Sequence, residues 1–167
     1  MKFRTLFLIF ASIVGINVRA DLPSYSFFKR AVGEWAGHGV VENSKAGMKF
    51  RSTGSGRVRF SNNLKTVKLH GEIQRQNTQQ TYEYTLKFVE EDGEIVASLR
   101  SDVDFDADFI VKVAADGTFI YGIHTDEKTG LTIASKAFFR NEALIVETEV
   151  TMMGMVMMTS RDIYRKN

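Results

Sequence analysis

The sequence contains no cysteine and only one proline, Pro23, in 167 residues. Without cysteine the chain can form no disulfide, and it offers no thiol for the attachment of a lipid. Its stability must therefore come from burial of apolar side chains and from backbone hydrogen bonds. Because the only proline precedes the segments in which we expect strands, no predicted strand contains a residue that cannot donate to its ladder.

The first twenty residues have the composition of a secretory signal peptide. Lys2 and Arg4 form a basic start, and the apolar run Leu6–Ile16 is too short to span a bilayer comfortably. Val18-Arg19-Ala20 then places small residues at the two positions that a signal peptidase reads. We therefore predict a cleaved signal at residues 1–20 and a secreted or periplasmic protein, with an uncleaved membrane anchor as the alternative.

The charge of the chain is close to balance once this segment is set apart. Its removal takes away three of the 22 lysines and arginines, which leaves 19 against 20 aspartates and glutamates. A nucleic-acid partner would require a concentrated basic face, so we predict no such partner. Residues 21–167 are long enough for one domain with a proper core, and we expect no membrane span in the mature chain.

A short helix is predicted directly after Pro23. Ser24 can cap it, Phe27 and Phe28 would lie on one apolar side, and Gly33 would stop it. We expect these phenylalanines to cover one end of the fold that follows.

Beyond this helix, apolar and polar residues alternate with the two-residue period of strands that are wet on one side. Turn signals at Glu91-Asp92-Gly93, Ala115-Asp116-Gly117 and Arg140-Asn141-Glu142 separate successive strands. The residues expected to point inward are Met48, Phe50, Val58, Phe60, Val67, Leu69, Ile73, Tyr82, Tyr84, Leu86, Phe88, Ile95, Ala97, Leu99, Phe105, Ala107, Phe109, Val111, Val113, Phe119, Tyr121, Ile123, Leu131, Ile133, Phe139, Leu144, Val146 and Val150.

About ten consecutive antiparallel strands with short turns can remove their exposed edges by closing on themselves. The basic residues on the outer parity, such as Arg57 and Arg59, argue against an outer-membrane barrel, whose outer band is apolar. The sequence therefore predicts an all-β fold, an antiparallel up-and-down barrel of about ten strands with a short N-terminal helix.

The stretch Val32–Gly39, with the sequence V-G-E-W-A-G-H-G, contains the only tryptophan of the chain. It resembles the Gly-x-Trp-x-Gly-x-Gly opening of a lipocalin-like (calycin-type) family of short bacterial secreted proteins of unknown function. Ser160–Arg165 is similar to the end of that family's last strand, and the chain more distantly resembles the nitrobindin-like barrels. The resemblance implies a structural role for Trp35 on the barrel floor, with Arg161 or Arg165 stacked on it.

Cofactor and metal binding are not favoured. The nitrobindin-like proteins ligate haem through a late histidine, whereas here no histidine follows His124, so we expect no haem and no other cofactor. His38 and His70 lie on other predicted strands with outward parity, so we predict no metal site. The row Asp104, Asp106 and Asp108 could hold calcium, but a solvated outer face is the favoured interpretation.

The run Met152–Met158 is the most unusual composition in the chain. Met153, Met155 and Met157 share one parity, whereas Met152 and Met158 share the other. Flexible, polarisable methionines suit an adaptable cavity wall. Ordinary core packing, an apolar pocket and copper(I) capture are the three alternatives for this run.

Aromatic residues supply the rest of the predicted wall. A ten-stranded barrel is wider than side chains alone can fill, so we expect an internal cavity in which tyrosine hydroxyls orient the polar head of a ligand. The predicted ligand-binding residues are Phe50, Tyr82, Tyr84, Phe105, Phe109, Tyr121, Met153, Met155 and Met157.

The sequence thus favours a binding protein for a small hydrophobic or amphipathic molecule. No nucleophile, base and orienting group stand at recognisable spacing, so we predict no catalytic residue. One alternative is an enzyme that uses the same cavity, for which Glu147 is the odd acid that shares parity with Ile145. The other is a ligand-free barrel that associates with itself, as a homodimer, or with a partner protein.

Overall fold

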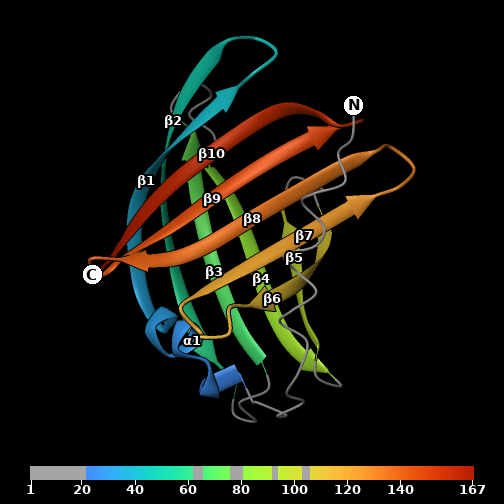
Figure 1. The fold of residues 1–167 in the computed structure, drawn as a ribbon. Coiled ribbons are helices and arrows are strands. Elements are labelled where there is room, and N and C mark those ends of the chain that lie inside the picture. Colours follow the sequence, from blue (N-terminus) through green and yellow to red (C-terminus); the bar gives the residue numbers. More distant parts are fainter. Residues whose placement is uncertain (1–21, 62–65, 76–80, 92–93, 103–105) are drawn as a thin grey trace.

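The computed structural model describes residues 22–61, 66–75, 81–91, 94–102 and 106–167, in which ten antiparallel strands close into a barrel (Figure 1). Each strand pairs with its neighbours in sequence, and β1 also pairs with β10. This confirms the predicted all-β up-and-down barrel with a short N-terminal helix. The predicted signal at 1–20, the turn residues 92–93, Asp104 and Phe105 lie outside the described residues.

The strands follow one another through short connections. Their bounds are β1 (Gly33–Asn43), β2 (Met48–Phe60), β3 (Thr66–Arg75), β4 (Thr81–Glu91), β5 (Glu94–Ser101), β6 (Ala107–Val113), β7 (Phe119–Asp126), β8 (Leu131–Arg140), β9 (Ala143–Met152) and β10 (Met155–Lys166). The predicted turn at Arg140-Asn141-Glu142 is a tight hairpin in which Asn141 and Glu142 both have positive φ, as a two-residue connection between twisted strands requires.

A 3-10 turn, η1 (Leu22–Ser24), and a one-and-a-half-turn helix, α1 (Ser26–Ala31), lie across one end of the barrel (Figure 1). Leu22 and Phe28 are completely buried there. None of the helical segments in the described ranges has the length and apolar composition that crossing a membrane requires.

The start of α1 differs from the prediction. Its N-cap is Tyr25, whose side chain makes no capping hydrogen bond, so the predicted cap at Ser24 is wrong. The helix is anchored instead by tertiary contacts, because the Ser26 hydroxyl and the Phe27 backbone N–H both donate to the Gly117 carbonyl, at 2.6 and 2.8 Å. Tertiary bonds to the β6–β7 turn thus replace the local cap.

An aromatic cluster forms the floor of the barrel above α1. The Phe28 ring meets Phe88 edge-on, with 5.2 Å between centroids, and the Phe27 ring lies 5.3 Å from that of Phe139. The Trp35 ring also packs against Phe139, with 5.9 Å between centroids. These rings bury large apolar areas and interlock, so α1 closes this end of the barrel.

Trp35 itself is held by a hydrogen bond as well as by packing. It is 4% exposed, and its indole Nε1 donates to the Ala31 carbonyl at 2.7 Å. The cation above its ring is the Lys166 ammonium, 5.2 Å from the ring centroid. The predicted burial of Trp35 on the barrel floor is therefore confirmed.

The predicted arginine partner of Trp35 is wrong. Arg161 is opposite Val40, far along β1 from the tryptophan, and its guanidinium lies 3.6 Å from the Glu147 carboxylate on the outer face. Arg165 is exposed and stands opposite Ala36, on the outward parity of β10. The alternation of β10 places Lys166, the last residue of the strand, on the side of the sheet that faces the indole, rather than either arginine.

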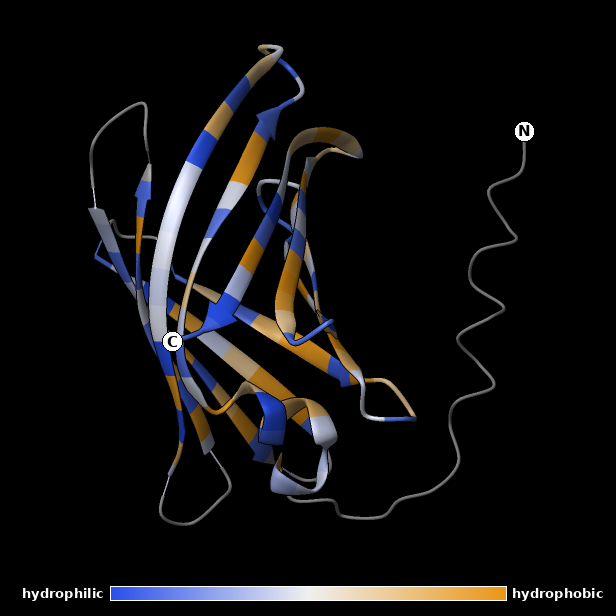
Figure 2. Cartoon of the chain, turned by 90° about the vertical axis from the view of Figure 1, so that its left-hand side faces the viewer, coloured by the Kyte–Doolittle hydropathy of each residue, from blue (hydrophilic) through white to orange (hydrophobic). Residues whose placement is uncertain are grey.

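The predicted alternation of inward and outward residues holds along most of the strands, and Figure 2 shows hydrophilic and hydrophobic residues alternating along the sheet. In β7 the predicted parity is wrong, because Ile120 and Gly122 face the interior. Tyr121 stands opposite the outward-facing Lys112 and Lys136 of the flanking strands. Phe119, Tyr121 and Ile123 therefore lie on the outer face.

Closure of the barrel brings β10 very close to the glycines of β1. Gly37 stands opposite Tyr164, and a Cβ atom placed on Gly37 would lie 2.1 Å from the Ile163 carbonyl oxygen. No side chain fits in that space without moving the backbone of one of the two strands.

We expect Gly37→Ala to lower the free energy of unfolding by roughly 1–3 kcal/mol, the usual cost of overpacking, in urea denaturation followed by tryptophan fluorescence. Ala36→Ser adds one atom at the adjacent exposed position and should change stability by less than about 0.5 kcal/mol. Equal stability of Gly37→Ala and the wild type would contradict the close approach of the two strands.

Candidate ligand-binding cavity

A cavity of about 690 Å³ occupies the interior of the barrel, and α1 and all ten strands contribute to its wall. Trp35 and Phe28 bound it next to α1, and Ile73 and Leu131 lie at its other end. Most of the lining residues are aliphatic or aromatic. A cavity of this size and composition is typical of sites for small molecules.

The structure places only part of the predicted ligand-binding set in this wall. Tyr82, Tyr84 and Phe109 line the cavity as expected. Phe50 has the inward parity of β2 but lies near the β1–β2 hairpin, outside the lining set, and is half-buried. Tyr121 lies on the outer face, so its predicted place in the wall is wrong.

The three predicted methionines do not line the cavity either. Met153 is 78% and Met155 64% exposed in the β9–β10 hairpin, and Met157 is half-buried. A register shift in β10 between Val156 and Met158 changes the parity of the strand, so that Met158 is the methionine that faces inward. The alternation rule failed for Met157 because it assumed an unbroken ladder. Met155 pairs with Met152, which stands opposite Leu131, so Met155 keeps the inward parity but lies in the hairpin beyond the cavity.

The acid proposed for an enzyme also faces outward. Glu147 pairs with Arg161 on the outer face, whereas its neighbours Val146 and Thr148 line the cavity. The acid that lies inside is Asp162, which the sequence reasoning missed. The available signal was its two-residue spacing from Tyr164, on the parity that faces the glycines of β1.

Asp162 is the centre of an interior polar cluster, which we define as Ser52, Tyr84, Ser160, Asp162 and Tyr164. The Ser52 hydroxyl donates to Asp162 Oδ1 at 3.4 Å, and the Ser160 hydroxyl donates to Oδ2 at 3.3 Å. Both distances are long for a hydrogen bond from a hydroxyl to a carboxylate, in which the two oxygen atoms normally lie less than 3 Å apart. The carboxylate is therefore only weakly solvated by the protein.

The electrostatics of the cluster reflect its burial. Burial raises the pKa of the Asp162 carboxyl above its usual range, although the hydroxyls of Ser160 and Ser52 act in the opposite direction. Burial and the nearby Asp162 charge raise the pKa of Tyr84 to about 12. The pKa of Tyr164 is also raised, by burial first and then by the charges of Tyr84 and Asp162. Both phenols are therefore neutral at physiological pH.

The glycines of the Gly-x-Trp-x-Gly-x-Gly motif explain how Asp162 and Tyr164 fit against β1. A Cβ atom on Gly39 would lie 1.8 Å from Asp162 Oδ1, and one on Gly37 would lie 2.7 Å from Tyr164 Cδ1. The carboxylate and the ring thus occupy the space that side chains at these two positions would fill. The motif supplies room for the polar cluster as well as for barrel closure.

Two further glycines leave room for the tyrosine hydroxyls. The Tyr164 hydroxyl lies 3.3 Å from the Cβ position of Gly54 in β2, and the Tyr84 hydroxyl lies 2.9 Å from that of Gly71 in β3. The two phenols therefore reach toward the same part of the sheet from opposite sides. Within the described residues neither hydroxyl has a hydrogen-bond partner, and both residues line the cavity.

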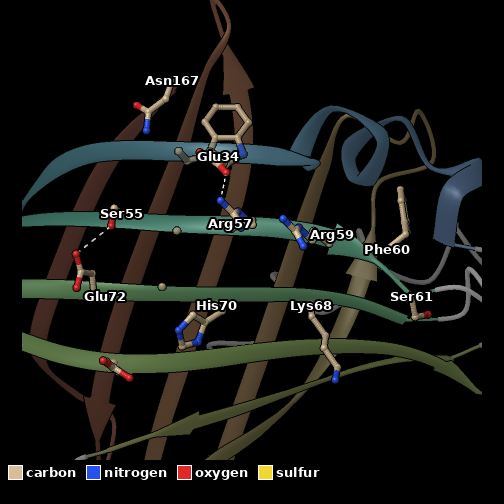
Figure 3. Close-up of a pocket in the computed structure, with 14 residues that line it drawn as sticks. Glu34, Ser55, Arg57, Arg59, Phe60, Ser61, Lys68, His70, Glu72 and Asn167 are labelled. Atoms are coloured by element: carbon tan, nitrogen blue, oxygen red, sulfur yellow. Dashed lines mark hydrogen bonds and ion pairs between the residues drawn. The ribbon is translucent and has the colours of Figure 1, made fainter.

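A second pocket, of about 620 Å³, is a groove on the outer face of β1–β4 (Figure 3). Its wall is charged: Glu34 pairs with Arg57, and the Ser55 hydroxyl donates to Glu72 at 3.2 Å. It lacks the continuous apolar wall of the interior. The interior cavity is therefore the better candidate for a site that takes a small molecule.

Among the remaining residues considered as metal ligands, Asp106, Asp108 and His70 lie on the outer face. His124 instead shares the inward parity of Ile120 and Gly122, stands opposite Ile133, and has its ring 5.7 Å from that of Phe109. The Arg100 guanidinium forms ion pairs with Asp106 and Asp108, at 3.5 and 3.0 Å, so a cation on β5 balances the charges of these acids. His124 Nδ1 lies 2.8 Å from the Asp108 carbonyl, and His70 Nδ1 3.3 Å from the Thr85 hydroxyl. In the part of the chain that the structure describes, no three acidic or histidine side chains converge on one point.

Comparison with known proteins identifies the fold and not a family. No protein-family model matches the chain, and no curated protein matches it. Among solved structures, the barrel is similar to Rv2717c from M. tuberculosis, with a TM-score of 0.64 and 9% identity over 83% of this chain and 93% of that one. A de novo designed fluorescence-activating β-barrel matches with a TM-score of 0.45 and 10% identity over 89% and 99% of the two chains.

The likeness to Rv2717c shows a shared barrel fold alone. Together with the strand order, it defines the class of the protein as a closed, ten-stranded antiparallel barrel, which is compatible with a calycin-like barrel.

Replacement of Asp162 should reveal the cost of burying its charge. Because its pKa is raised on folding, its contribution to stability is full below the ordinary value of 3.8 and is lost as pH rises through the folded pKa. Asp162→Asn should therefore be more stable than the wild type at pH 7, and this advantage should shrink toward pH 4. Urea denaturation of both proteins at several pH values measures the difference.

The matched control for this prediction is Asp106→Asn, which removes an exposed carboxylate from the outer face. It should give no gain in stability at pH 7. An Asp162→Asn variant that is less stable than the wild type at pH 7, or whose advantage does not change with pH, would contradict the prediction.

Proposed function

We propose that this protein is a secreted or periplasmic, calycin-like binding protein that holds a small apolar or amphipathic molecule inside its barrel. The observation that carries the proposal is the 690 Å³ cavity with its mainly apolar wall. Each buried methylene contributes about 0.8 kcal/mol, so a chain of about ten carbons contributes roughly 8 kcal/mol. That is the free energy of micromolar binding before the cost of immobilising the ligand.

Processing after Ala20 is compatible with the fold of the described residues. Leu22, the second residue after the predicted cleavage site, is completely buried under the barrel floor. Cleavage there would leave η1 and α1 intact.

A neutral apolar fluorophore, N-phenyl-1-naphthylamine, tests the cavity directly. We expect its emission to rise on binding, with a Kd in the micromolar range. Leu99 and Val150 line the cavity on different strands. Leu99→Trp and Val150→Trp each place a bulky indole ring in the cavity, so each should weaken binding at least tenfold. Ile110→Trp places the same ring on the outer face, where Ile110 is 57% exposed, and should leave the Kd unchanged.

If the wild type fails to bind the fluorophore, or if all three tryptophan variants bind it equally well, the interior cavity is not a binding site.

Native mass spectrometry of the protein purified from its own host tests the cellular part of the proposal. We expect a mature chain that begins at Asp21, together with a reproducible extra mass that organic solvent extracts. A chain that retains residues 1–20 would contradict secretion by a cleaved signal. A clean mass of a dimer without any extractable molecule would favour the self-associating barrel. An exposed apolar surface for it is the β9–β10 hairpin, where Met152, Met153, Met155 and Val156 are exposed.

A further inference from the structure

We propose that the ligand carries a protonated amine, which the Asp162 carboxylate and the hydroxyls of Tyr84 and Tyr164 bind while the apolar wall holds the rest of the molecule. This inference rests on the proposed function, because it names the chemical class of molecule that the interior cavity selects.

The first support is the charge of the cavity wall. Among the described residues that line the cavity, Asp162 is the only acid, and none is a lysine, arginine or histidine. The carboxylate is half-buried and accepts two long hydroxyl bonds, from Ser52 and Ser160. A buried charge without a counter-ion is costly, and a cationic ligand would supply that counter-ion.

The second support is the match between donors and acceptors. An ammonium group has three N–H donors and no acceptor. The cluster offers the Asp162 carboxylate and the two phenolic oxygens of Tyr84 and Tyr164, which have no partner within the described residues. The raised pKa values of both phenols keep these oxygens neutral, so that they accept hydrogen bonds without adding charge. Three acceptors that face one cavity thus match three donors.

The third support is what the cluster would reject. A carboxylate head would meet the Asp162 charge in a region of low dielectric, where like charges repel strongly. No cationic side chain within the described wall could offset that repulsion. A neutral alcohol could bond to the same oxygens but would leave the charge of Asp162 uncompensated. The expected order of affinity is therefore amine, then alcohol, then carboxylate.

The test uses three probes with the same ten-carbon chain: decylamine, 1-decanol and decanoate. Each competes with N-phenyl-1-naphthylamine for the wild-type protein at pH 7, so the displacement curves report affinity for the same cavity. We expect decylamine to bind at least tenfold more tightly than 1-decanol, and decanoate to bind more weakly than either.

Two variants assign the preference to the cluster. Asp162→Asn should abolish the preference for decylamine, a loss of at least tenfold, while the Kd of 1-decanol changes less than twofold. Tyr164→Phe, which keeps the ring and removes one acceptor, should weaken decylamine severalfold and provides a second route if Asp162→Asn does not fold. Glu147→Gln removes an acid from the outer face of β9 and should leave all three affinities unchanged.

The possible results separate the two proposals. If 1-decanol binds but decylamine binds no more tightly, the amine inference is overturned and the apolar cavity site stands. If Asp162→Asn and Glu147→Gln reduce decylamine binding equally, the preference arises from general charge rather than from the cluster, which also overturns the inference. If neither the fluorophore nor any of the three probes binds, the proposed function fails together with the inference.

Discussion

The close packing of β10 against the glycines of β1 is the constraint on which the rest of the structure depends. A barrel without free edges requires the first and last strands to pair, and here β1 and β10 pair along their length. Gly37 and Gly39 permit this approach because they leave room for Tyr164 and Asp162. Barrel closure and the interior polar cluster therefore have the same physical origin.

The interior combines an apolar wall with a charged carboxylate, and these two features have opposite effects on stability. An apolar wall stabilises the barrel and lowers the local dielectric, and the same low dielectric raises the cost of the Asp162 charge. Where a protein keeps a destabilising group of this kind, the position is commonly a functional site, and stabilising contacts elsewhere in the fold offset its cost. The aromatic floor around Trp35 and Phe139 provides that stability at the opposite end of the cavity.

Much of the fold could be predicted because alternation is unambiguous in most strands. In β4, for example, Tyr82 and Tyr84 alternate with Glu83 and other polar residues, and only one parity can face a core. In β7 both parities are apolar, so alternation alone could not choose between Tyr121 and its neighbours. The outward position of Tyr121 follows from its pairing with Lys112 and Lys136 on the two flanking strands. Counting residues back from the turns on either side of β7 would have indicated this pairing.

The candidate site was harder to predict than the fold. The register shift between Val156 and Met158 arises from the three-dimensional ladder, so alternation assigned Met157 rather than Met158 to the wall, and the sequence does not show that Met153 and Met155 lie in a hairpin beyond the cavity. Asp162 was missed for a different reason, since sequence rules assign an isolated acid to the solvent. Only the pairing of β10 with Gly39 places its side chain inside the barrel.

The pairing of β1 with β10 also bears on how the chain folds. The other nine strand pairs join sequence neighbours and can form as local hairpins, whereas this one joins the two ends of the domain. Such a contact carries the largest loop-closure entropy in the molecule and can form only after the last strand has been synthesised. Asp162 and Tyr164 are in that last strand and lie against Gly39 and Gly37 of the first. The polar cluster is therefore assembled in the same kinetic step that completes the barrel.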